Sequence, residues 1–230
     1  MWNRREALAA GTGLAVGVLA NAVPRLSLAD DADAKKFEQM VARGIDFLRT
    51  KGQSPDGSYS AAAGPGVTAL ATAAILKHGR SADDPAVSKS LKYLEQFIQE
   101  DGGLNKVGSK YRNYETCLAI LAFKEANKGG RYDALLKKAD GYVKSEQWDE
   151  GEGKDKSDFT YGGSGYGSKS RPDLSNTSFL IEALQATGNS ADSEAMQRAL
   201  LFVSRCQNLE SQFNSTPFAA KNPDGGFYYT

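Results

Sequence analysis

The stretches KADGYVKSEQ at residues 138–147 and RALLFVSRCQ at residues 198–207 share one pattern, and this pattern decides the fold. Each begins with a basic residue and an alanine, has an aromatic residue four positions after the basic one, and closes with a glutamine. RGIDFLRTKGQ at 43–53 and KSLKYLEQFIQ at 89–99 vary the pattern, with one extra residue before the glutamine. A Gly-rich loop follows every glutamine. Self-similarity at this spacing is typical of a repeat protein.

A second kind of apolar segment follows each of the first three loops. The three segments align on Thr68, Thr116 and Thr177, and each has an alanine six positions later. The segments that end in glutamine are apolar on one face, whereas these are apolar around most of their circumference. We therefore expect them to be helices buried between neighbours. Because strand-type alternation is essentially absent, we predict an all-α fold built from repeats of an outer helix, a loop and an inner helix.

Composition restricts the class of function. The 28 basic and 28 acidic side chains give a net charge of zero, which argues against nucleic acid as a partner. The two cysteines lack metal-ligand spacing, and the single histidine excludes sites that need two imidazoles. The sequence contains no P-loop, no GxSxG elbow and no dinucleotide fingerprint. We predict neither a cofactor nor a metal.

The N-terminus has the features of an export signal. Arg4 and Arg5 precede ALAAGTGLAVGVLANAVP, an uncharged stretch rich in alanine and glycine that leads to small-residue cleavage sites after Ala22 or Ala29. The arginine pair resembles a bacterial twin-arginine signal. The prediction is therefore a signal peptide at 1–29, a linker at 30–36 and a repeat domain at 37–230. It places the protein in the periplasm or another extracytoplasmic space. The alternative is a retained anchor and membrane association.

The repeat pattern resembles the QW motif of terpenoid cyclases such as squalene–hopene cyclase, and of the wider prenyltransferase/squalene-oxidase repeat family. The resemblance covers about residues 35–230 and implies an α/α toroid, with a cavity at the ends of the inner helices. No loop ends in the family's tryptophan; the residues that stand nearest are Tyr59, Leu104, Tyr161 and Phe227. The resemblance implies packing rather than chemistry for the motif residues Phe47, Gln53, Tyr93, Gln99, Tyr142, Gln147, Phe202 and Gln207.

The number of repeats predicts an incomplete ring. The sequence supplies three helix pairs and a fourth outer helix with its loop, about three and a half repeats. The family's ring is closed. We therefore expect a partial ring that is a C-terminally truncated portion of a longer toroid. An open end of the arc would expose apolar surface, so we also expect self-association through that end.

Asp173 is the one weak candidate for a catalytic residue. In the cyclases, the proton donor lies in a DxDDTA motif at the start of an inner helix. The matching stretch here is DLSNTS at 173–178, with Ser175 and Asn176 in place of aspartates. An acid that protonates an alkene needs neighbouring groups that keep it protonated. We therefore expect Asp173 to cap its helix.

The cysteines allow two further interpretations. Glu115-Thr116-Cys117 is similar to the Asp-x-Cys zinc ligands of prenyltransferase β subunits, but the single His78 lies upstream of it. We therefore predict a buried thiol at Cys117 and no zinc. For an exported protein, a disulfide between Cys117 and Cys206 is the alternative that the sequence leaves undecided.

Together these observations predict a non-catalytic scaffold that binds a hydrophobic or peptide ligand. The aromatic loop FTYGGSGYG at 159–167 and the starts of the inner helices provide the candidate contacts. These ligand-binding candidates are Tyr114, Glu115, Tyr161, Tyr166, Asp173 and Asn176. The alternative is an isoprenoid-processing enzyme of the terpene cyclase or prenyltransferase type, with its catalytic residues mostly beyond residue 230.

Overall fold

The computed structural model describes residues 31–167, 169–215, 217, 219, 221 and 223–229. The predicted signal peptide at 1–29 lies outside these residues. The chain divides into two compact units, Met1–Met40 and Val41–Thr230. Helix α2 (Asp31–Phe47) runs through the boundary between them, so the stretch assigned to a linker is helical from Asp31 onward. In the described part of the chain, no helix has both the length and the hydrophobicity needed to cross a membrane.

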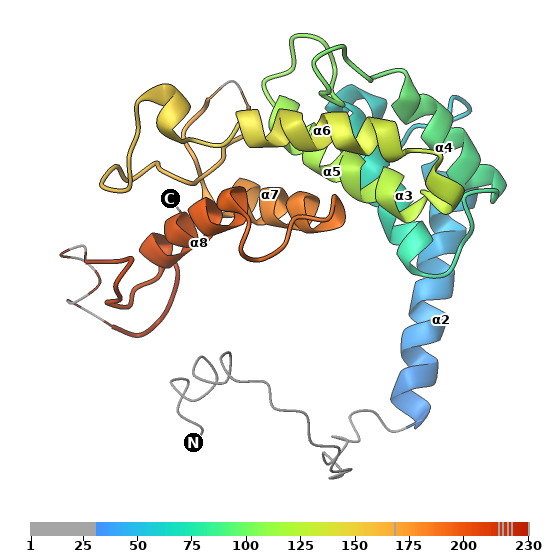
Figure 1. Cartoon of the computed structure of the whole chain (residues 1–230). Helices are drawn as coiled ribbons and strands as arrows, with labels where there is room; N and C mark the ends of the chain where they lie inside the picture. Colours follow the sequence, from blue (N-terminus) through green and yellow to red (C-terminus); the bar gives the residue numbers. More distant parts are fainter. Residues whose placement is uncertain are drawn as a thin grey trace, which may run out of the picture. The chain divides into compact units, whose positions relative to one another are not determined.

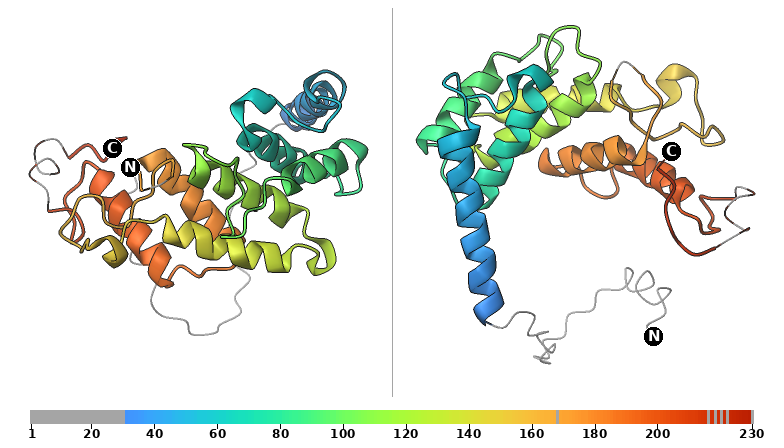
Figure 2. Two further views of the ribbon diagram at one scale, coloured as in Figure 1. Left: turned by 90° about the horizontal axis from the view of Figure 1, so that it is seen from above. Right: turned by 180° about the vertical axis from the view of Figure 1, so that it is seen from behind.

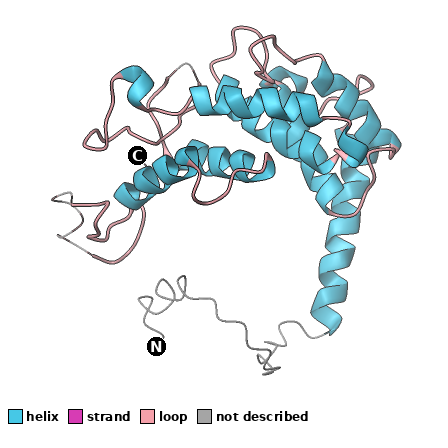
Figure 3. Ribbon diagram, in the orientation of Figure 1, coloured by secondary structure: helices cyan, strands magenta, loops and turns pink. Residues whose placement is uncertain are grey.

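The larger unit is built from helices and loops, as Figures 1 and 3 show. After the end of α2 it contains α3 (Pro65–Lys77), α4 (Pro85–Glu95), α5 (Arg112–Glu125), α6 (Asp133–Ser145), α7 (Leu174–Ala186) and α8 (Glu194–Cys206). Extended pairing among the described residues is limited to isolated bridges in the loops. The predicted all-α fold class is confirmed.

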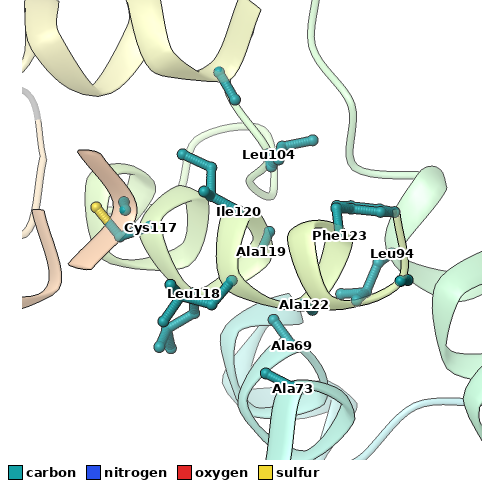
Figure 4. Close-up of a cluster of buried hydrophobic side chains, with 14 of the residues drawn as sticks. Ala69, Ala73, Leu94, Leu104, Cys117, Leu118, Ala119, Ile120, Ala122 and Phe123 are labelled. Atoms are coloured by element: carbon teal, nitrogen blue, oxygen red, sulfur yellow. The ribbon is translucent and has the colours of Figure 1, made fainter. Parts of the chain in front are cut away.

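The helices form the two predicted layers. The inner helices α3, α5 and α7 pack against one another in succession, and each contacts the outer helix that follows it in the chain. Figure 2 gives two further views of this succession. In Figure 4, Ala69 and Ala73 of α3 face Ala122 of α5, and these small side chains allow the two helices to approach closely. Because α5 has an inner neighbour on each side, its residues from Glu115 to Phe123 are all buried.

The three aligned threonines tie each inner helix to the loop that precedes it. Thr68, Thr116 and Thr177 lie in the first turns of α3, α5 and α7, and each hydroxyl accepts a hydrogen bond from a loop backbone N–H. The donors, at 2.9, 3.0 and 3.0 Å, are Tyr59, Leu104 and Ser164. Tyr59 and Leu104 are also two of the residues that stand nearest to the family's loop tryptophan, whereas in the third loop the donor is Ser164 and not Tyr161.

One glycine in each of these loops lies against the next outer helix. Gly57, Gly102 and Gly162 have φ angles of 92°, 93° and 84°, a left-handed backbone that favours glycine. A Cβ on any of them would collide with the backbone carbonyl of the basic residue that marks the next repeat. These basic residues are Lys89, Lys138 and Arg198. The shared geometry of the three contacts explains why each loop needs a glycine where it meets the next outer helix.

The motif glutamines reinforce this contact between repeats. Gln53 Nε2 donates to the backbone oxygen of Ala86 at 2.7 Å, and Gln147 Nε2 donates to that of Ala195 at 3.0 Å. Both acceptors lie in the first turn of the next outer helix. The motif aromatics pack between repeats as well, since Tyr93, Tyr142 and Phe202 are all buried. Gln207 donates to Gly225 O at 3.1 Å, within its own loop.

The extra residue in the first two repeats is accommodated in two different ways. In the first repeat, a π-helical turn at Leu48–Gly52 absorbs it, so that Gln53 still reaches the next helix. The second repeat has no such turn among its described residues, and Ile98 takes the glutamine position. Gln99 therefore donates to Phe97 O and Asn105 O, inside its own loop.

The predicted packing role is wrong for Phe47, whereas Gln99 keeps a structural role within its own loop. Gln99 does not join its repeat to the next one, because the uncompensated insertion moves it one position along the loop. Phe47 is 60% exposed, and Leu48 packs against the core instead. The π-helical turn begins at Leu48, and it changes which side chain faces inward at the end of α2.

We predict that Gly162→Ala lowers the free energy of unfolding by about 3 kcal/mol or more, because it adds a backbone collision to left-handed strain. Gly188→Ala is the matched control: Gly188 has a φ of 94°, but no described atom lies within 4 Å of the place where its Cβ would stand. Strain alone is expected to cost the control about 1–2 kcal/mol. Chemical denaturation of both variants measures the difference. Equal losses would contradict the proposed role of the Gly162 contact.

Candidate functional site

Asp173 caps the N-terminus of α7, as expected from the sequence. Its Oδ1 accepts a hydrogen bond from the Asn176 backbone N–H at 2.8 Å, and its Oδ2 accepts one from Asn176 Nδ2 at 2.6 Å. Asp173 is 6% exposed and Asn176 is 1% exposed. One asparagine thus engages both oxygens of the carboxyl group as acceptors.

An aromatic cluster lies at the N-terminal ends of α5 and α7. We call it the tyrosine cluster and define it as Tyr111, Tyr114, Tyr166, Phe179 and Tyr229. Tyr166 contacts Tyr111 and Tyr114 with ring centroids 5.2 and 6.0 Å apart, and Tyr114 contacts Phe179 at 5.3 Å. All three contacts are edge-to-face, the arrangement that aromatic rings favour. Tyr111, Tyr166 and Tyr229 remain 51%, 40% and 55% exposed.

The loop before α7 is fixed over the start of α5 by backbone hydrogen bonds. Tyr166 O accepts from the N–H groups of Asn113 and Tyr114, at 2.9 and 3.4 Å. The buried amide of Asn113 donates to Ser164 Oγ at 2.7 Å and to Gly165 O at 2.8 Å. The bonds to Tyr166 O satisfy N–H groups of the first helical turn that have no partner within the helix. They also place the Tyr166 ring against Tyr114.

Tyr229 connects the tyrosine cluster to Asp173. Its backbone oxygen accepts from the Leu174 N–H at 2.8 Å, in the first turn of α7. Partial burial, a hydrogen bond with Tyr166 and the charge of Asp173 together raise the pKa of Tyr229 to about 12. The hydroxyl groups of Tyr166 and Tyr229 and the Asp173 carboxylate therefore form one polar group at the edge of the aromatic surface.

Glu115 lies next to Tyr114 in the chain, but its side chain is directed into the preceding loop. It is 2% exposed, and it accepts from the Lys106 N–H at 3.1 Å and from Ser109 Oγ at 3.0 Å. Gly64 lies directly against its Oε1, where a Cβ would collide. Burial raises the pKa of Glu115, although the two hydrogen bonds act in the opposite direction. Glu115 thus holds the loop at 106–109 and adds no polar group to the tyrosine cluster.

Tyr161 lies apart from the other candidate residues, beside the outer helix α8. It is 2% exposed, and its hydroxyl donates to Glu150 Oε1 at 2.6 Å. Burial and this hydrogen bond raise the pKa of Tyr161. Glu150 in turn pairs with Arg198 of α8 at 2.7 Å. The structure therefore brings together Tyr114, Tyr166, Asp173 and Asn176, and leaves out Tyr161 and Glu115.

Both cysteines are buried free thiols, so the suggested disulfide between Cys117 and Cys206 is not formed. Cys117 is fully buried in α5, and its thiol donates to Asn113 Oδ1 at 3.6 Å. Burial raises its pKa well above the ordinary value. Among the described residues, no three His, Cys, Asp or Glu side chains lie together as metal ligands would.

Sequence reasoning missed three members of the tyrosine cluster: Tyr111, Phe179 and Tyr229. Two of them carried a usable signal, because Tyr111 and Phe179 flank the first turns of inner helices whose threonines had already been aligned. No such signal marks Tyr229, since nothing in the sequence indicates that the fourth loop returns to the start of α7.

We predict that Glu115→Gln removes a pH dependence of stability. The folded state raises the pKa of Glu115 above the value of 4.5 for an unperturbed glutamate, so it binds more protons than the unfolded state between the two values. The stability of the unaltered protein therefore falls as pH rises through this window. Denaturation measured from about pH 4 to pH 7 should show the variant gaining stability relative to the unaltered protein as pH rises. A difference that does not change with pH would contradict this.

Comparison with known proteins agrees with this architecture. No match was found among curated proteins. The family model described as the squalene-hopene cyclase C-terminal domain matches residues 62–230, well over half of the chain. This range includes all three inner helices and the capped start of α7. An all-helical structure with alternating inner and outer helices is consistent with the α/α toroid of that family. The chain therefore belongs to the squalene-hopene cyclase C-terminal domain family.

Proposed function

We propose that this member of the cyclase family is an exported, non-catalytic scaffold that binds a hydrophobic or peptide ligand at the tyrosine cluster. The observation that carries the proposal is the state of Asp173, whose two carboxyl oxygens both accept hydrogen bonds from Asn176. Ser175, at the second carboxylate position of the acid motif, is exposed and supplies no carboxyl group. A group arranged in this way stabilises a helix end, whereas a catalytic acid depends on neighbours that keep it protonated.

The tyrosine cluster supports a binding role. Three of its tyrosines are 40% or more exposed, although monomeric proteins bury most aromatic surface. Tyrosine offers a rigid apolar ring and a polar hydroxyl group, a combination that is enriched at binding surfaces. The hydroxyl groups of Tyr166 and Tyr229 beside Asp173 add polar contacts at the rim.

A panel of random peptides, screened on the immobilised protein, tests the binding site. We expect selected peptides to lose at least tenfold in affinity for the Tyr111→Ser/Tyr166→Ser variant, since exposed aromatic anchors carry about 1–2 kcal/mol or more each. Phe47→Ser is the control, because Phe47 is an exposed aromatic residue that lies outside the cluster. Selected peptides that bind both variants equally well would exclude the cluster as the site.

Incubation with squalene tests the absence of catalysis. We expect product analysis by gas chromatography and mass spectrometry to return only unchanged squalene, while an active squalene–hopene cyclase run in parallel forms cyclised triterpene. Cyclised product that disappears in Asp173→Asn would show that the acid position is functional after all, and would overturn the non-catalytic part of the proposal.

The export part of the proposal rests on Arg4 and Arg5 ahead of the uncharged stretch. Replacing both with lysine keeps the positive charge but removes the arginine pair. We predict that cell fractionation finds the unaltered chain outside the cytoplasm, and the Arg4→Lys/Arg5→Lys chain retained inside it. An identical distribution of the two chains would argue against a twin-arginine signal.

A further inference from the structure

A cavity of about 440 Å³ lies between α8, the loop before α7 and the segment around Tyr228. This volume is within the range of small-molecule sites. Phe159, Pro172 and Phe202 form apolar walls, and Phe202 is nearly fully buried. The charged side chains among the described lining residues are two arginines, Arg171 and Arg205, and no described carboxylate lines the cavity. The cavity is therefore apolar with a positively charged rim.

Two arginines of α8 that lie two turns apart differ sharply in their partners. Arg198 makes three ion pairs and is fully neutralised. The carboxylates that pair with it, at 3.0, 2.7 and 2.8 Å, are those of Asp149, Glu150 and Glu194. Arg205 donates one hydrogen bond, to the backbone oxygen of Asp158 at 2.6 Å, and forms no ion pair within the described part of the chain. The guanidinium group of Arg205 can therefore form an ion pair with a bound anion.

The surroundings of Arg205 support the same conclusion. Burial lowers the pKa of its guanidinium group, although the nearby Asp158 and Asp155 act in the opposite direction. The Asp158 carboxylate is already paired with Lys154 at 2.7 Å. A guanidinium group has five N–H donors in a planar fork that matches a carboxylate or phosphate, and the residues that the structure describes use only one of them.

A second hollow of about 890 Å³ shares Phe159 and Arg205 with the cavity but is less suited to an anion. Its described lining mixes the carboxylates of Glu150 and Glu194 with three cationic side chains, and both carboxylates pair with Arg198. Of the two, the smaller cavity is the one whose described charged lining is purely basic, together with apolar walls.

We propose that the cavity binds an anionic amphiphile: a molecule with an apolar chain or ring and a single carboxylate or phosphate head. The head pairs with Arg205 and Arg171, and the apolar part packs against Phe159 and Phe202. This site is separate from the tyrosine cluster and does not depend on the function proposed for it.

Isothermal titration calorimetry of the full chain with dodecanoate and with dodecyl phosphate, each below its aggregation threshold, tests the proposal. We expect saturable binding of at least one of them, and no saturable binding of dodecyltrimethylammonium, which has the same chain and a cationic head. A preference between the two anionic probes supports the site and identifies its head group. Failure of both anionic probes to bind, or equal binding of the cationic one, would overturn it.

Substitutions locate the site. Arg205→Gln is expected to weaken binding at least tenfold, but it also removes the hydrogen bond to Asp158 O. Arg171→Gln is therefore the second variant, because Arg171 is exposed. Arg131→Gln loses the same charge at a surface ion pair with Glu95 and should bind as the unaltered protein does. Unchanged affinity in both cavity variants would overturn the proposal, whereas unchanged affinity in Tyr111→Ser/Tyr166→Ser is expected.

Discussion

The contact between a left-handed glycine and the backbone of the following outer helix is the constraint on which the rest of the structure depends. It occurs three times, at Gly57, Gly102 and Gly162, and each time the partner is the carbonyl of the basic residue that opens the next repeat. Backbone can approach backbone this closely only where the side chain is a hydrogen atom. Three of the four motif aromatics are buried, and two of the glutamines bond the next outer helix, so one short pattern in the sequence specifies both the loop and the position of that helix.

The repeat pattern was sufficient to predict the helical layers, the buried inner helices and the cap at Asp173. These features depend on local periodicity and on residues that act within one or two turns. The pattern could not show that a π-helical turn absorbs the insertion before Gln53 while nothing described absorbs the one before Gln99. Either outcome is compatible with the sequence, because packing against the neighbouring repeat decides between them. Tyr229 entered the candidate site for a similar reason, through a long-range contact with Leu174.

At the candidate site, the stretch that matches the acid motif of the cyclases holds a helix cap. Asn176 occupies a place where the cyclase motif carries a carboxyl group, and its backbone and side chain both bind Asp173. The asparagine side chain therefore adds a donor to the cap, beside the backbone N–H. On α8 the two arginines differ: Arg198 pairs with three carboxylates, whereas Arg205 forms no ion pair within the described part of the chain.

The glycine contacts and the contacts of Gln53 and Gln147 point the same way along the chain: the loop of one repeat closes on an outer helix that is synthesised after it. The amide of Gln53, for example, finds its acceptor in Ala86, 33 residues later. On the ribosome, each loop therefore cannot make these contacts until the next outer helix has emerged. The packing of each repeat is completed only after one further helix has been synthesised. Repeat proteins couple mainly between nearest neighbours, so this delay does not accumulate as the chain grows.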